Sequence, residues 1–278
     1  MRLSLCNEVL RELDFPDQCA LARGLGYDGL EVAPFTLSDE PQRLAHARRT
    51  ELRRIAADAG LRVTGLHWLL LAPQGLSITS DHLADRRRTV EMMRRLIELC
   101  ADLGGKILVH GSPGQRRIAP GQSPDAALGH AKECFAAIAR DAEQAGVTYC
   151  IEPLAKDETL LINTVEAAAA IVREIDSPAV RTMIDACAAG RAEAQPIPDL
   201  IDRWLPGGMV AHIHLNDPER YAPGQGLLRF APILAALQRQ SYEGIASVEP
   251  FVYQPDGPTC AAHARSYLKG LLESVQTP

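Results

Sequence analysis

The chain has 278 residues, of which 46% are hydrophobic and 23% charged, a composition typical of a soluble globular protein with a large core. Its formal net charge of −6 disfavours nucleic acid and anionic membranes as partners, because an acidic surface repels phosphate groups. No apolar stretch is long enough to cross a bilayer and the seven cysteines form no CxxC pair, so we expect a cytoplasmic protein with reduced thiols and no signal peptide.

Short β-prone runs alternate with longer helical patterns along the whole chain. The predicted strands cover residues 3–6, 29–33, 62–68, 106–110, 147–152, 180–185, 210–215 and 244–249. The predicted helices cover about 16–25, 43–59, 86–103, 125–145, 165–175, 231–240 and 259–274. Glycines 24, 26 and 29 match the dinucleotide pattern GxGxxG, but a helix precedes them and a strand follows, which is the reverse of the required order. We therefore expect no nicotinamide cofactor.

The predicted strands recur at steps of about 35 residues, the length of one strand–helix unit. Strands separated by helices run parallel, and eight of them can close into a barrel. An open doubly wound sheet is the alternative, but it usually has fewer strands and a reversal point. No linker or low-complexity tract divides the chain. We predict an α/β fold, a (β/α)8 TIM barrel, forming a single domain over residues 1–278.

Four consecutive predicted strands end in residues that can carry chemistry. Glu152, Asp185, His214 and Glu249 stand at the ends of strands five to eight. Because active sites of such barrels lie at the carboxyl ends of the strands, these side chains should meet at one rim. Each acid alone could instead cap the next helix or pair with an arginine. Three acids together would repel one another unless a cation lay between them.

Carboxylates combined with one imidazole suit a divalent metal ion, with no strong choice among Mn, Co, Mg and Zn. The sequence thus predicts one divalent metal ion as the cofactor. It does not fix the assembly, and a homodimer or a homotetramer is compatible with it.

The sequence resembles the xylose-isomerase-like barrels of sugar phosphate isomerases and epimerases, including the ketose 3-epimerases, over essentially its whole length. The resemblance is strongest in Ile151–Pro153, Met183–Asp185, His212–Asp217, Pro223–Gly226 with Phe230, and Tyr242–Glu249. It implies a sugar or sugar-like substrate and an isomerase or epimerase reaction. A proton next to a carbonyl is removed to give an enediolate, whose charge a metal can stabilise.

The resemblance also assigns roles to residues. It implies that Glu152, Asp185, His214 and Glu249 hold the metal, and that Glu152 and Glu249 act as acid and base on opposite faces of the substrate. Glu158 and Arg220 match positions that contact substrate in the epimerases; a surface salt bridge is the alternative reading of Arg220.

Two further histidines end predicted strands. His67 closes strand three and His110 closes strand four, so we expect both to face the same mouth and to contact substrate. A hydrogen-bonded structural role is the alternative for each. Glu31, near the end of strand two, is a further candidate for contact with substrate at this mouth. The loop at 111–118 is rich in donors, and Arg116 or Arg117 could bind an acidic group if that loop folds toward the metal. His212 should lie one layer below His214.

One position departs from the family pattern. Many sugar isomerases and epimerases of this type carry a histidine three residues after the strand-six aspartate, where this chain has Ala188. We therefore expect weak epimerisation of free fructose, psicose or tagatose, because a hydrogen-bond donor to the sugar is missing.

Two other functions remain open at this stage. Abasic-site endonucleases share this barrel and hold a zinc cluster with residues that His67 and His110 would partly match, although Ala188 and the acidic charge speak against a nuclease. A non-catalytic sugar-binding barrel stapled by a metal is the other alternative, since a fold alone does not fix a function.

Overall fold

Alternation of short apolar runs with amphipathic helices produces a closed parallel barrel. The computed structural model describes residues 1–275, and its strands form one ring in the order β1 to β8. The strands are β1 Arg2–Cys6, β2 Gly29–Val32, β3 Val63–Leu66, β4 Ile107–His110, β5 Thr148–Ile151, β6 Val180–Asp185, β7 Val210–Leu215 and β8 Ile245–Val248. Pairing of Leu3 with Ala246 and of Leu5 with Val248 closes the ring between β1 and β8.

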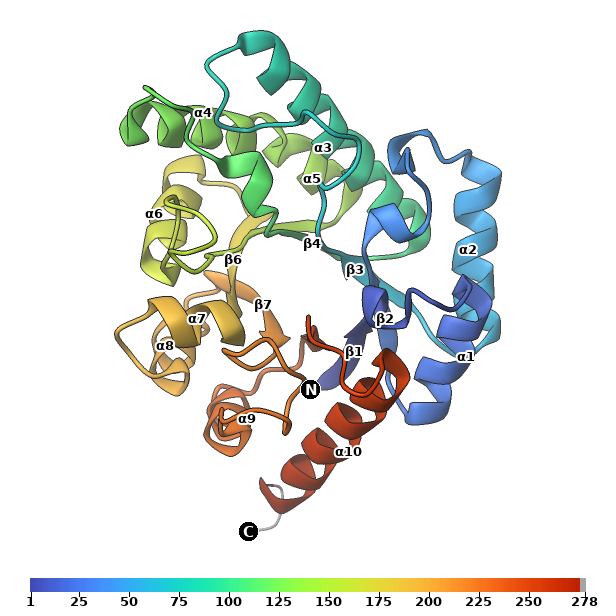
Figure 1. Ribbon diagram of the computed structural model, residues 1–278. Helices are drawn as coiled ribbons and strands as arrows, with labels where there is room; N and C mark the ends of the chain where they lie inside the picture. Colours follow the sequence, from blue (N-terminus) through green and yellow to red (C-terminus); the bar gives the residue numbers. More distant parts are fainter. Residues whose placement is uncertain (276–278) are drawn as a thin grey trace.

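Helices surround the strands on all sides (Figure 1). They are α1 Phe15–Leu25, α2 His46–Asp58, α3 Leu83–Leu103, α4 Pro124–Ala137, α5 Ala139–Ala145, α6 Val165–Ile175, α7 Ala186–Ala192, α8 Ile197–Trp204, α9 Phe230–Arg239 and α10 Gly257–Val275. Four 3-10 turns complete the described elements: η1 Asn7–Leu10, η2 Pro34–Thr36, η3 Pro41–Arg43 and η4 Pro113–Arg116. Helix α10 packs against both α9 and α1, so the helical layer also closes. None of the helices within residues 1–275 is both long and apolar enough to span a membrane.

The core has two layers because successive strand residues point to opposite faces of the sheet. The larger layer lies between the barrel and its helices and includes Leu108, Phe135 and Tyr149. A small cluster of Val109, Cys150 and Met183 forms a separate apolar layer. These three residues alternate along β4, β5 and β6 with members of the larger layer, which places them inside the barrel.

The sequence-based fold prediction is confirmed, with local differences. Each predicted strand overlaps an observed one, and the predicted helix at 125–145 is divided by Ile138 into α4 and α5. Helices α7 and α8 were not predicted. The apolar spacing of Ile197, Leu200, Ile201 and Trp204, after Pro196, would have indicated α8, but the alanine-rich α7 has no comparable pattern.

Candidate functional site

Four buried side chains converge at the carboxyl ends of β5 to β8. Glu152 follows β5 directly, Asp185 ends β6, His214 lies near the end of β7 and Glu249 follows β8 directly. One potential ligand atom from each lies within 4.8 Å of those of the other three. The structure therefore brings together all four residues that the sequence analysis named as metal ligands.

Strand register explains this convergence. Asp185 on β6 pairs with His214 on β7, and His214 pairs with Ser247 on β8. Because side chains two residues apart share a face, Glu249 points to the same side as Ser247. The carboxyl ends of parallel strands thus place acid and imidazole side by side.

The His214 ring is held between three carboxylates. Its Nδ1 lies 2.8 Å from Glu249 Oε2 and 3.8 Å from Asp185 Oδ2, while its Nε2 lies 3.0 Å from Glu31 Oε1. This arrangement directs Nδ1 at the acid cluster, and a carboxylate on the far nitrogen is the usual way to fix the ring of a metal-binding histidine.

Glu31 lies below the cluster, buried at the end of β2. Its carboxylate also contacts His212 Nε2 at 2.7 Å and accepts a hydrogen bond from Ser247 Oγ at 2.5 Å. Burial raises the pKa of Glu31, but the charges of His212 and His214 outweigh it and hold that pKa well below its usual range. Glu31 therefore orients the histidine ring rather than reaching substrate. His212 lies beside Glu31, as expected for the layer below His214.

Asn216 positions Asp185, a role that the sequence analysis did not identify. Its Nδ2 donates to Asp185 Oδ2 at 2.7 Å and to the backbone oxygen of Glu249 at 3.2 Å, and its Oδ1 accepts from the Cys187 amide at 2.7 Å. The Ala188 amide donates to the other Asp185 oxygen at 2.6 Å. One fully bonded amide side chain thus ties together the ends of β6, β7 and β8.

Burial and mutual repulsion raise the pKa values of two of the acids, whereas neighbouring histidines lower that of the third. Burial, then the charges of Asp185 and Glu249, raise the pKa of Glu152 well above its usual range. Burial and Glu249 likewise raise the pKa of Asp185 to about 6. Burial also raises that of Glu249, but His214 and His67 outweigh this and bring its pKa down to about 2.

This donor set fits a divalent cation. Three buried carboxylates share one small space, and burial together with the charge of Glu249 raises the pKa values of the other two, Glu152 and Asp185. A cation among them would remove the repulsion, and the His214 Nδ1 is already directed at that space. Oxygen ligands with one imidazole suit Mn, Co, Mg and Zn alike.

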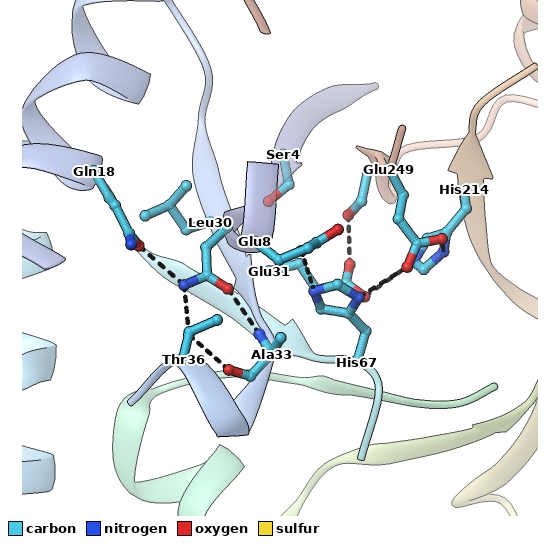
Figure 2. Close-up of polar contacts among 12 residues, drawn as sticks. Ser4, Glu8, Gln18, Leu30, Glu31, Ala33, Thr36, His67, His214 and Glu249 are labelled. Atoms are coloured by element: carbon cyan, nitrogen blue, oxygen red, sulfur yellow. Dashed lines mark hydrogen bonds and ion pairs between the residues drawn. The ribbon is translucent and has the colours of Figure 1, made fainter. Parts of the chain in front are cut away.

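His67 faces the mouth, as the sequence analysis expected. Its Nδ1 lies 2.9 Å from Glu249 Oε1 and its Nε2 lies 2.9 Å from Glu8 Oε2 (Figure 2). Burial lowers the pKa of His67, but the neighbouring Glu8 and Glu249 raise it to about 10. Glu8 was not identified from sequence, because it lies in the 3-10 turn η1 after β1 and not at a strand end.

The expectation that His110 faces the same mouth is wrong. Its Nδ1 forms a hydrogen bond of 2.7 Å with the Tyr149 hydroxyl, and its ring packs edge-on against Phe135 of α4, with centroids 5.0 Å apart. The side chain therefore points outward into the layer between barrel and helices. Gly111, one residue later, points inward instead: a Cβ there would lie 1.6 Å from Glu152 Oε2.

The loop at 111–118 does not offer Arg116 to a substrate. Arg116 is fully buried, and its guanidinium donates to the backbone oxygen of Glu152 at 2.8 Å and to that of His110. It holds together the ends of β4 and β5 and so fixes the backbone that carries Glu152. Arg117 is exposed.

Glu158 and Arg220 form a pair from the loops after β5 and β7. Arg220 Nη2 lies 3.0 Å from Glu158 Oε1, and the other carboxylate oxygen accepts from the Ala155 amide at 3.1 Å. Arg220 has a φ of 69°, a conformation uncommon for a non-glycine residue. Its carbonyl accepts from the amides of Phe251 and Val252, which joins the loops after β7 and β8.

Comparisons with known proteins place this geometry in a family context. The family profile described as xylose isomerase-like TIM barrel matches residues 19–271. The chain is 27% identical to a D-psicose 3-epimerase from Ruminiclostridium cellulolyticum, over 87% of this chain and 80% of that protein. It is 24% identical to a 3-dehydro-D-guloside 4-epimerase from Escherichia coli, over 90% of this chain and 92% of that protein. The structure of a D-psicose 3-epimerase with D-tagatose from Clostridium cellulolyticum has the same fold, with a TM-score of 0.83, 20% identity and 99% coverage of both chains.

We predict that Arg116→Met lowers the free energy of unfolding by about 1–3 kcal/mol, because it removes the hydrogen bonds that the guanidinium donates to the buried carbonyl oxygens of Glu152 and His110. Denaturant unfolding followed by circular dichroism measures this change. The control is Arg117→Met, which removes the same charge from an exposed neighbour and should change stability by less than about 0.5 kcal/mol. Equal effects of the two substitutions would contradict a structural role for Arg116.

Proposed function

Because the chain belongs to the xylose isomerase-like TIM barrel family and is an enzyme of the isomerase class, we propose that it is a divalent-metal-dependent sugar epimerase. The observation that carries this proposal is the buried cluster of Glu152, Asp185, His214 and Glu249 at the barrel mouth. The two relatives bear names of different epimerisations, at C3 of a ketose and at C4 of a 3-dehydro sugar. In both, the inverted carbon is next to a ketone. We propose this same reaction class for the chain.

Glu152, Asp185, the Nδ1 of His214 and Glu249 would hold the metal. When bound, the metal supplies positive charge that stabilises the enediolate formed on proton removal. The protein's own side chains carry out the proton transfer. Glu152 and Glu249 enter the mouth from β5 and β8, so the substrate carbon can lie between their carboxylates.

One glutamate takes the proton from the carbon next to the ketone, and the electron pair of the broken C–H bond moves into the enediolate. The other glutamate returns a proton to the opposite face of the same carbon, which inverts it. The surroundings push the pKa of Glu152 up, mainly by burial, and that of Glu249 down to about 2 through the two histidines. Two carboxyl groups whose surroundings shift their pKa values in opposite directions are typical of an acid–base pair.

Substrate recognition is proposed for side chains at the rim. Glu158 and Arg220 present a carboxylate and a guanidinium from two loops that follow barrel strands, which suits hydrogen bonding to sugar hydroxyls. His67 forms part of the wall beside Glu249. At the Ala188 position only a backbone amide contacts Asp185, and the prediction of weak activity on free ketohexoses stands.

The other two functions have less support. A nuclease-type zinc cluster would need His110 in the mouth, and its ring packs against Phe135 instead. A binding protein without catalysis would not exchange protons with its ligand. We therefore test the function by incubating metal-loaded protein in D2O with free ketohexoses, 3-keto glycosides and phosphorylated ketoses. Deuterium incorporated next to the ketone, together with the epimer, supports the proposal; binding without exchange would contradict it.

We predict that Glu152→Gln and Glu249→Gln each lower kcat on the exchanging substrate by on the order of 10²–10⁴-fold, because an amide cannot accept or return the proton. Steady-state kinetics at saturating metal measures the loss. The control is Glu143→Gln, which makes the same change on the exposed surface of α5 and should leave kcat unaltered. Wild-type rates in either of the first two variants would rule out the two-glutamate mechanism.

Gly111 gives a second test, directed at the metal site. A Cβ at this position would overlap Glu152 Oε2, the far end of a flexible side chain. We predict that Gly111→Ala displaces that carboxylate and weakens Mn²⁺ binding about 10–100-fold, with little loss of stability. Calorimetric titration measures the affinity. Gly114→Ala, where a Cβ meets no atom within 4 Å, is the control and should bind Mn²⁺ like the wild type. Unchanged affinity in Gly111→Ala would remove Glu152 from the ligand set.

A further inference from the structure

A second group of potential ligands lies at the same mouth, and of its members only Glu249 is assigned a step in the proposed reaction. Cys6, Glu8, His67 and Glu249 are all buried, and one ligand atom from each lies within 4.8 Å of the others. Only Glu249 is shared with the cluster of Glu152, Asp185 and His214. The second group combines a thiol, an imidazole and carboxylates.

The topology separates the two groups. Cys6 ends β1, Glu8 lies in η1 immediately after it, and His67 follows β3 directly. Because β1 lies between β8 and β2 in the ring, the second group occupies the arc from β8 to β3, whereas the first occupies β5 to β8. Figure 2 shows His67 between Glu8 on one side and Glu249 on the other.

Three buried polar atoms in this group have no hydrogen-bond partner: both carboxylate oxygens of Glu8 and the Nε2 of His67. The Nε2 lies only 2.9 Å from Glu8 Oε2, yet the orientation does not make a hydrogen bond. Two ligand atoms of one tetrahedral cation, each bound at about 2.0–2.3 Å, are roughly 3.3–3.8 Å apart. Glu8 Oε2 and His67 Nε2, at 2.9 Å, would need to separate by less than about 1 Å to face a common ion.

The other ring nitrogen supports this reading. His67 Nδ1 forms a hydrogen bond of 2.9 Å with Glu249 Oε1. This contact holds the His67 ring in place beside Glu249 and Glu8. A ring oriented by a carboxylate is typical of metal-binding histidines.

The turn that carries Glu8 is held rigidly. The Asn7 side chain donates to Gln18 Oε1 at 2.9 Å and to Thr36 Oγ1 at 2.8 Å, and it accepts from the Ala33 amide at 2.8 Å. All hydrogen bonds of this amide group thus tie η1 to α1 and to the segment after β2. A preformed turn is what a ligand site requires, because little ordering remains to be done on binding.

We propose that Cys6, Glu8 and His67, together with Glu249, form a second divalent-cation site beside the first. A thiolate and an imidazole among carboxylates suit Zn²⁺ or Co²⁺ and disfavour Mg²⁺, which prefers oxygen ligands. Glu249 then has one carboxylate oxygen near each site: Oε2 near His214 and Oε1 near His67. The proposal does not depend on the substrate, because the site is detected by metal binding alone.

Co²⁺ is the probe for this site. Chelator-treated, reduced protein is titrated with Co²⁺ by calorimetry and by absorption, because a thiolate–Co²⁺ bond gives a charge-transfer band in the near ultraviolet. The wild type should bind two equivalents and show the band. Cys6→Ser should lose the band. Glu8→Gln, which is nearly isosteric, should weaken one of the two equivalents by at least about 10-fold.

Two controls separate this proposal from the first site. Cys19→Ser removes another buried thiol, on α1, and should keep both equivalents and the band. Asp185→Asn should weaken the other equivalent and keep the band. The second site would be overturned if the wild type bound one equivalent of Co²⁺ without the charge-transfer band. It would also be overturned if Cys6→Ser retained that band. A loss in Asp185→Asn alone would then leave the first site standing.

Discussion

Burial of several carboxylates within reach of one another is the constraint on which the barrel mouth depends. Glu152, Asp185 and Glu249 lie together, almost without solvent contact. Ionised acids in such a place are unfavourable by several kcal/mol each unless a positive charge or hydrogen-bond donors compensate them. The neighbouring side chains provide part of this compensation. Two histidines contact Glu249, and Asn216 with the Ala188 amide satisfies Asp185. Glu152 has the least compensation of the three acids, and its pKa is raised by burial and by the other acids.

The barrel supplies the geometry at low cost in backbone distortion. Parallel strands end at one rim, and side chains two residues apart share a face, so acids at strand ends meet without special loops. Residues below the cluster and residues outside the barrel hold the ligand side chains and their strands in place. Glu31 holds the far nitrogen of His214, and Arg116 binds the carbonyls at the ends of β4 and β5. These buried polar contacts have little purpose in a barrel that is only a scaffold, but they are expected where ligand atoms must be fixed.

The sequence predicted the parts of the site that follow from strand periodicity. Glu152, Asp185, His214 and Glu249 were found because each ends an apolar run of a predicted strand. The same reasoning failed for His110, where a one-residue difference in register turns the side chain to the other face. Glu8 was missed because a 3-10 turn has no periodic signal. The hydrogen-bond partners of Asn216 and Arg116 lie on neighbouring strands. They could not be predicted, because the spacing of residues along the chain does not give the distances between strands.

The claim that a divalent cation replaces protons among these acids is tested most directly by counting the protons released on metal binding. Chelator-treated protein is titrated with Mn²⁺ near pH 7 in two buffers of different ionisation enthalpy. Burial and neighbouring acids raise the pKa of Glu152, which favours the protonated carboxyl group in the metal-free protein, and this group must lose a proton to bind a metal. The account predicts net proton release and an affinity that rises with pH. Absence of binding, or binding without proton release and without pH dependence, would contradict it.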